Sequence, residues 1–112
     1  LETIFKQVKR HRGFAFPAHV DVATYSLLGQ FGFMPSNLDI KAVGITAACN
    51  VNKLLQHYPF LQDFVLIRNS DAHCLQDIGS GHTEFLLKEP TLQEIIRAMN
   101  DRDSIRISSF KK

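Results

Sequence analysis

The sequence predicts an α/β domain in which short parallel strands alternate with helices. Segments with apolar residues at helical spacing alternate along the chain with short, almost continuously apolar segments of strand character. Strands that are apolar on both faces are typical of parallel sheets covered by helices. A length of 112 residues and a hydrophobic content of 45% suit one domain with a buried core. We therefore expect residues 1–112 to form a single domain.

The alternation gives the expected elements in chain order. Residues 2–9 carry apolar side chains at helical spacing, and Gly13 is a natural stop for this helix. The other elements expected in the first half are a buried strand over 14–18, a short helix from 24 to 29 or 32, a turn-rich link over 33–37 and a strand over 42–46.

The second half continues the same pattern. Asn50 is suited to cap a helix, and the pair Tyr58-Pro59 ends that helix. The elements expected after it are a strand over 64–67, a loop over 75–82, a strand over 83–87, a helix from 90 or 91 with one apolar side, and a last short strand or an arm over 104–110.

Residues of types that commonly bind metals follow two of the expected strands. His19 comes after the strand at 14–18, and Asp71-Ala72-His73 comes after the strand at 64–67. Ligand sites of parallel sheets form at the carboxyl ends of the strands. On an extended backbone, residues two apart point to the same side, so we expect Asp71 and His73 to face one pocket.

A carboxylate and an imidazole together suit a divalent ion such as zinc, manganese or iron. The alternative interpretation of the same tripeptide is that Asp71 caps the next helix and that His73 is a surface side chain.

Four segments resemble, in order and spacing, the C-terminal part of the polymerase and histidinol phosphatase (PHP) family. They are Phe16-Pro17-Ala18-His19-Val20-Asp21, residues 26–35, Ser70-Asp71-Ala72-His73 and Asp77-Ile78-Gly79. The resemblance implies a distorted TIM-like (β/α)7 barrel, of which this chain is the C-terminal half. It also implies a cluster of divalent metals at the strand ends and hydrolysis of phosphate esters. Carried over residue by residue, it makes His19, Asp71 and His73 metal ligands.

The sequence departs from the family pattern in two ways. The family's early His-x-His pair, a further His and a carboxylate come from its N-terminal half, and no His-x-His occurs here. Either that half was removed from this chain, or a descendant of the family lost it. The retained ligand residues and an abrupt start at Leu1 favour the first explanation, so we expect the chain alone to be inactive. The second departure is Gly44, where similar relatives often carry a Glu.

Two hypotheses for the function follow. The first is a part of a metal-dependent phosphoesterase that acts on a phosphorylated small molecule or a nucleotide by means of metal-activated water. The second is a degenerate, non-catalytic PHP-like module that binds a partner or a metabolite. Under either hypothesis an incomplete sheet has an uncovered edge. We expect the chain to self-associate or to pair with the missing N-terminal half.

Two other residues are candidates for the surroundings of the metal. Asp21 is close enough in sequence to orient the ring of His19, or it caps the following turn. His82 lies between Gly81 and Thr83 and would contact a phosphate at the pocket mouth, or it is a solvated loop residue.

Composition excludes several function classes. The net charge is +2 and the basic residues are scattered, so no specific nucleic-acid surface is indicated. No apolar run approaches the roughly 20 residues that cross a bilayer. Cys49 and Cys74 lie in no C-x-x-C motif, and no secretory signal precedes them. We therefore expect a cytoplasmic protein with reduced thiols.

Overall fold

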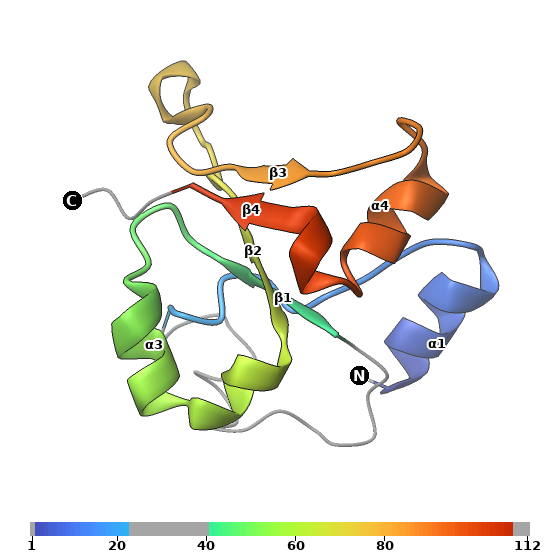
Figure 1. Cartoon of the computed structure of the whole chain (residues 1–112), viewed down its shortest axis with the longest axis horizontal. Coiled ribbons are helices and arrows are strands. Elements are labelled where there is room, and N and C mark those ends of the chain that lie inside the picture. The colour runs from blue at the N-terminus through green and yellow to red at the C-terminus, as the bar shows by residue number, and fades with distance from the viewer. Residues whose placement is uncertain (1, 23–40, 109–112) are drawn as a thin grey trace.

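The computed structural model describes residues 2–22 and 41–108 (Figure 1). Its helices are α1 (Glu2–Arg10), α3 (Val51–His57) and α4 (Leu92–Ala98), and its strands are β1 (Ala42–Ile45), β2 (Val65–Arg68), β3 (Thr83–Phe85) and β4 (Ile105–Ile107). Three short 3-10 helices span Pro59–Asp63, Leu75–Asp77 and Arg102–Ser104. The helix expected from residue 24 and the link at 33–37 lie outside the described residues.

The centre of the fold is a parallel pair formed by β1 and β2. Ala42 lies opposite Val65 and Ile45 lies opposite Arg68. The crossover between the two strands contains α3, which begins where the side chain of Asn50 accepts a hydrogen bond from the Lys53 backbone N–H at 3.2 Å. Two predicted strands, the helix between them and its cap are therefore confirmed.

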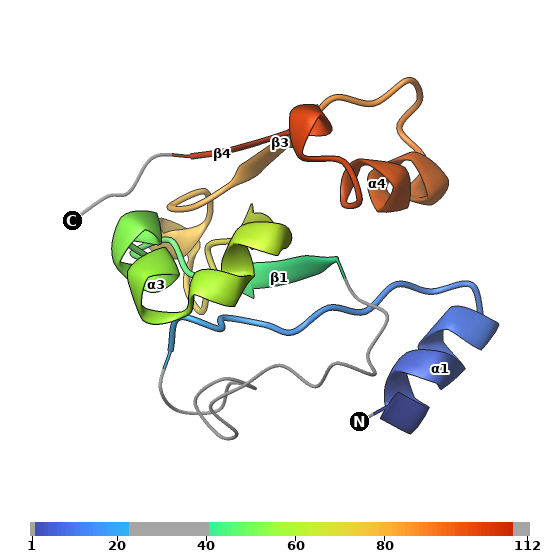
Figure 2. The same cartoon turned by 60° about the horizontal axis from the view of Figure 1, so that its bottom comes forward.

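The strand expected over residues 14–18 is not formed, although the end of this segment runs along β1 (Figure 2). The Gly44 N–H donates to the Pro17 carbonyl at 2.7 Å, and the Gly44 carbonyl accepts from the Val20 N–H at 2.9 Å. In a regular parallel ladder these two partners are two residues apart, and here they are three apart. The segment thus contains one extra residue, as in a β-bulge, and His19 lies there with a positive φ of 31°.

Gly44 allows this close approach. A Cβ atom at Gly44 would lie 3.3 Å from both Phe16 Cε2 and the Pro17 carbonyl oxygen. A side chain there would push the segment away from β1. The departure at Gly44 therefore has a structural consequence, because the missing side chain makes room for the bulged segment.

The prediction that residues 83–87 form another parallel strand is wrong. β3 is shorter and pairs with β4 in the antiparallel sense, with Glu84 opposite Arg106. The chain between them, including α4, returns so that β4 runs against β3. Burial alternates along both strands, as is typical of an antiparallel sheet covered on one face. Within the described residues the strands form two separate two-stranded sheets and no closed barrel.

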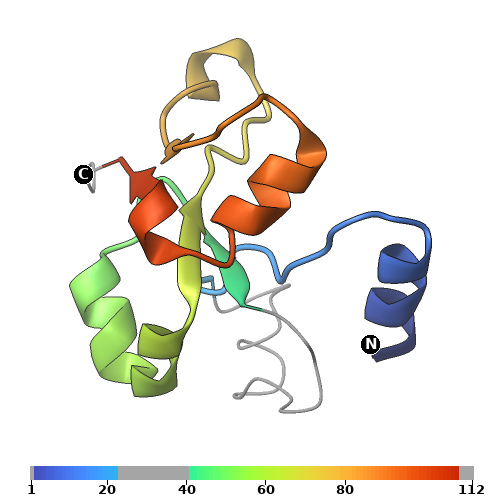
Figure 3. The same cartoon turned by 45° about the vertical axis from the view of Figure 1, so that its right-hand side comes forward.

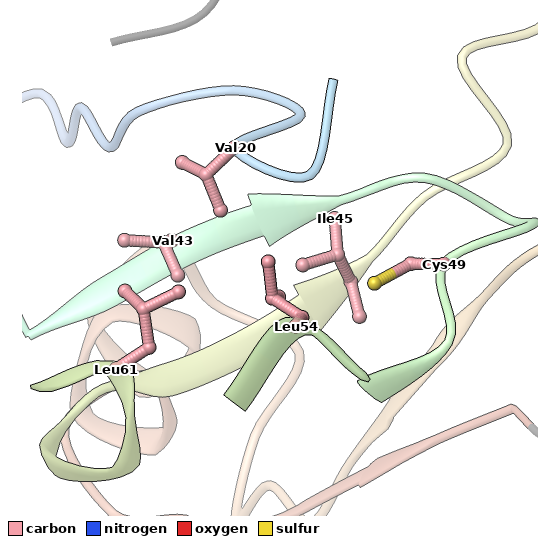
Figure 4. Close-up of a cluster of buried hydrophobic side chains, with 6 residues drawn as sticks. All are labelled: Val20, Val43, Ile45, Cys49, Leu54 and Leu61. Carbon is pink, nitrogen blue, oxygen red and sulfur yellow. The ribbon is translucent and has the colours of Figure 1, made fainter. Parts of the chain in front are cut away.

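Apolar side chains cover both faces of the parallel pair. One cluster lies between β1 and α3 and consists of Val20, Val43, Ile45, Cys49, Leu54 and Leu61 (Figure 4). The other consists of Ala42, Val65, Ile67 and Met99, with Phe14, Phe16, Phe85, Ile95 and Ile105 packed against it. A pair of buried strands with helices on its two sides is the α/β arrangement that the sequence predicts. Among the described helices, none has the length and hydropathy to cross a membrane.

Candidate metal centre

Three chain segments end at one edge of the structure. β1 and β2 are parallel, and the two hydrogen bonds to Gly44 show that residues 17–20 run in the same direction. The residues after these segments are 19–22, 46–50 and 69–73. The sequence predicted that the ligand residues would follow strand ends at a common edge, and the chain directions agree with it.

A buried arginine fixes the loop that follows β1. Arg68, the last residue of β2, is 1% exposed. Its Nη1 donates to the carbonyl oxygens of Thr46, Ala47 and Cys49 at 3.1, 2.9 and 3.0 Å. Buried polar groups need such partners, since an unpaired carbonyl or guanidinium is costly. The sequence reasoning missed Arg68, and the available signal was a cation in the last position of an otherwise apolar strand.

Asp21 connects the bulged segment to the same loop. Its carboxylate accepts hydrogen bonds from the Thr46 N–H at 2.9 Å and from the Thr46 hydroxyl at 2.5 Å. The predicted contact of Asp21 with His19 is not formed at Nδ1, because that atom has no hydrogen-bond partner. The observed bonds are those of a cap at the end of β1.

The thiol of Cys49 faces this buried polar group. Burial, and after it the negative charge of Asp21, raise the pKa of the Cys49 thiol from 9.0 to about 12. The residue is a neutral thiol near neutral pH and packs in the apolar cluster beside α3. Burial and the raised pKa are typical of an unreactive, structural cysteine.

His19 has a buried ring nitrogen without a partner. The residue is half-buried, and its Nδ1 is enclosed but accepts and donates no hydrogen bond. Unpaired buried side-chain nitrogens are uncommon in folded proteins and call for an explanation such as an absent ion. Imidazole nitrogen is also a preferred ligand of zinc and similar ions. This atom fits the predicted metal role of His19.

Asp71 and His73 lie in an exposed segment that leaves the end of β2 (Figures 1 and 3). The expectation of continued extended backbone is wrong, because β2 ends at Arg68 and Asp71 has a positive φ of 49°. The alternative in which Asp71 caps a helix is also wrong, since the 3-10 helix over Leu75–Asp77 begins without a side-chain cap.

A local hydrogen bond orients the ring of His73. Its Nδ1 lies 2.8 Å from the carbonyl oxygen of Asp71 and donates to it. A metal-binding His commonly makes this contact with one ring nitrogen, which leaves the other nitrogen to the ion. The Asp-x-His pair thus has a carboxylate and a free Nε2 on one short turn.

The structure does not gather the three predicted ligands. In residues 2–22 and 41–108, no group of three or more His, Cys, Asp or Glu side chains is placed to hold a metal ion. His19, Asp71 and His73 therefore share an edge of the fold without forming a site there. Their role as ligands stays a prediction.

His82 lies at the beginning of the antiparallel pair. Its N–H donates to Ser108 Oγ at 3.1 Å, and its carbonyl accepts from the Ser108 N–H at 2.9 Å. These bonds extend the ladder of β3 and β4 by one residue. The imidazole is exposed, and its predicted contact with a phosphate stays a prediction.

The neighbours of His82 fasten the antiparallel pair to the strand ends. The Thr83 hydroxyl donates to the Arg68 carbonyl at 2.9 Å and accepts from the Arg68 N–H at 2.8 Å. A Cβ atom on Gly81 would lie only 2.8 Å from Ala47 Cα, so the backbone at Gly81 packs directly on the loop after β1. The segment that begins at Asn69 is thus anchored again at residues 81–83.

Comparison with known families gives one finding. The family model PHP_C, described as PHP-associated, matches residues 67–104, a range that includes Asp71 and His73 but not His19. Neither curated proteins nor solved structures give a match. The family match and the Asp-x-His turn agree with the resemblance found in the sequence. The match over residues 67–104 thus supports a relation of this segment to the C-terminal portion of the PHP family.

Proposed function

We propose that this chain is part of a metal-dependent phosphoesterase in which His19, Asp71 and His73 bind divalent ions. Zinc, manganese and iron suit the proposed set of imidazole and carboxylate ligands. The observation that carries the proposal is the turn of the PHP-associated segment, where the Asp71 carbonyl holds His73 Nδ1 and leaves Nε2 free. The unpaired Nδ1 of His19 supports it.

The bound ions would supply the hydrolytic chemistry, since metals polarise a phosphate and activate water. The side chains of this chain would hold the ions at the edge where residues 17–20, β1 and β2 end. The substrate would be a phosphorylated small molecule or a nucleotide. In this proposal the described sheet is part of a distorted (β/α)7 barrel, and the remaining ligands come from an N-terminal half.

One observation favours the second candidate function, a non-catalytic PHP-like module. The described residues contain no group of three side chains that would hold an ion. A domain that had lost its metal site would keep the hydrogen bonds from the buried Arg68 to the loop after β1 for stability. It would use its surface for a partner or a metabolite.

Metal content separates the two candidates. The chain is purified with zinc, manganese or iron supplied, and the bound metal is measured by mass spectrometry. We expect about one ion per chain, because three protein ligands suffice for one open site. The double variant His19→Ala, Asp71→Ala should lose it.

The matched control is His11→Ala. His11 is an exposed imidazole whose Nδ1 also contacts a backbone carbonyl, that of Gln7 at 2.8 Å. This variant should keep the metal content of the unaltered chain. If the unaltered chain holds no more metal than the double variant, the ligand assignment is wrong for this chain.

A further inference from the structure

A pocket of about 400 Å³ lies between α3 and the ends of the first two parallel segments. Its walls come from residues 20–22, residues 48–50 and α3 with the residue after it. None of the three proposed metal ligands lines it. It is thus a concave site with side chains that the proposed metal chemistry does not use.

Cationic and polar groups of α3 line one wall of this pocket. Lys53 and His57 are four residues apart and lie on one face of the helix. The His57 ring contacts the ring of Tyr58 edge-on, with the centroids 4.4 Å apart and the planes at 87°. This contact places the imidazole against the ring of Tyr58. An ammonium, an imidazole and a phenol therefore provide hydrogen-bond donors on one wall.

The charge of this wall is not neutralised by a neighbour. Among the described residues, Lys53 makes no ion pair. Asp21 is the acidic residue in the lining; it keeps its negative charge, but its two oxygens are oriented toward Thr46 by hydrogen bonds from that residue. A negatively charged ligand would thus meet an unpaired cation.

Apolar side chains also line the pocket. Val20 and Leu54 belong to the buried cluster beside β1, and they line the pocket where it meets the core. Ligand sites commonly combine such an apolar surface with a few polar groups that fix the orientation of the ligand. A ligand with an anionic head and an apolar or aromatic body would contact both kinds of side chain.

We propose that this pocket binds a small organic anion. Lys53 and His57 would hold a phosphate or carboxylate head, and Val20 and Leu54 would contact the body of the molecule. The inference does not depend on the metal centre, since none of these residues is a proposed ligand of the ion.

The test is a titration of the full chain, freed of metal by a chelator, with phenyl phosphate, benzoate and inorganic phosphate. Binding is followed by amide chemical shifts. We expect saturable binding of an aromatic anion at residues 48–58, and weaker binding of inorganic phosphate, which lacks an apolar body. Preference for phenyl phosphate over benzoate would identify a phosphate head, and the reverse would identify a carboxylate head.

Two substitutions and two controls decide the assignment. Lys53→Gln and His57→Gln should each weaken binding by about tenfold, as the loss of one charge-assisted hydrogen bond does. Lys88→Gln removes an exposed lysine outside the pocket and should leave binding unchanged. Thermal unfolding of each variant verifies that it is folded.

The inference fails if no probe saturates, or if Lys53→Gln and Lys88→Gln weaken binding equally. It also fails if the double variant His19→Ala, Asp71→Ala abolishes binding while Lys53→Gln does not, because the anion would then be bound at the metal edge. Loss of metal in that double variant with unchanged anion binding would support two separate sites.

Discussion

The two regions that follow β1 and β2 differ sharply, although they leave the same edge of the sheet. Residues 46–49 are held by the buried side chain of Arg68, which is 1% exposed. Residues 69–79 are mostly exposed, and Leu75 and Ile78 are 82% and 67% exposed. Hydrogen bonds within the chain therefore fix the loop after β1. The proposed ligands Asp71 and His73 lie in the other region, which has little burial.

The exposure of the region after β2 is relevant to the predicted association of the chain with another polypeptide. Contiguous exposed apolar surface is typical of sites that contact another polypeptide. Self-association or pairing with an N-terminal half remains a prediction, and the exposed segment with Leu75 and Ile78 is where such a contact would be expected.

Arg68→Met should have the largest effect on the free energy of unfolding, because it removes the hydrogen bonds that hold the region after β1. The substitution keeps an apolar stem but leaves the buried carbonyl of Cys49 and the partly buried carbonyls of Thr46 and Ala47 without this donor. Each unsatisfied group costs about 1–3 kcal/mol, so we expect a loss of about 3 kcal/mol in the free energy of unfolding. Urea denaturation followed by circular dichroism measures it.

Arg106→Met is the matched control, because the Arg106 side chain is 85% exposed and makes only a 3.9 Å ion pair with Glu84. Its effect should be within about 0.5 kcal/mol, as for most surface substitutions. Equal losses of unfolding free energy in the two variants would show that Arg68 does not hold the loop at residues 46–49.

A smaller loss is expected from Gly81→Ala. The added Cβ would lie 2.8 Å from both Cα and Cβ of Ala47, and such overpacking costs about 1–3 kcal/mol. The same denaturation experiment measures it.

Gly79→Ala provides the comparison within the exposed region. Nothing lies within 4 Å of a Cβ there, but φ is +83°. Its cost of about 1 kcal/mol would come from the backbone conformation alone. Adding Ala47→Gly should recover part of the loss in Gly81→Ala and none of the loss in Gly79→Ala. Recovery in both would exclude a direct contact between residues 47 and 81.

The smallest effect in free energy concerns the two thiols, one in each region. Cys74 is exposed and Cys49 is buried. With a disulfide reagent at pH 8, Cys74 should react at once and Cys49 only as the protein unfolds. The released chromophore gives both rates. Fast reaction of both thiols in the folded chain would contradict the burial of Cys49.

The raised pKa of Cys49 also predicts a pH dependence of stability. Since the folded state holds the thiol proton more tightly than the unfolded state, the stabilisation is fully present below pH 9.0 and is lost as pH rises towards about 12. Cys49→Ala should remove this part of the pH dependence, and Cys74→Ala should not.

The sequence was sufficient to predict the elements that depend only on neighbouring residues. The apolar strands at 42–46 and 64–67 and the cap at Asn50 follow from composition and from one side-chain preference. The direction of β3 could not be predicted, because an apolar run looks the same whichever way its partner runs. Its pairing depends on how α4 turns the chain back.

The sequence could predict that His19 and Asp71 follow segments that end at one edge of the fold, but it could not predict the local backbone geometry there. An extended backbone was assumed after each strand, and His19 and Asp71 both have positive φ. Asp and His adopt positive φ more often than most other residues, but the conformation is uncommon even for them, so the residue types alone do not predict these two turns. Arg68 was missed for a related reason, since its three acceptors come from a loop about twenty residues earlier and are brought near only by the parallel crossover.

The bulge at His19 also has a consequence for the length of the chain. Pro17 and Val20 are both buried although they are an odd number of residues apart, and both bond to Gly44. In a regular strand, a single residue between these two anchors would complete the same pair of bonds. A chain shortened by Ala18 would therefore keep Pro17 and Val20 in the core. The one additional residue between the two anchors thus produces the turn in which His19 lies.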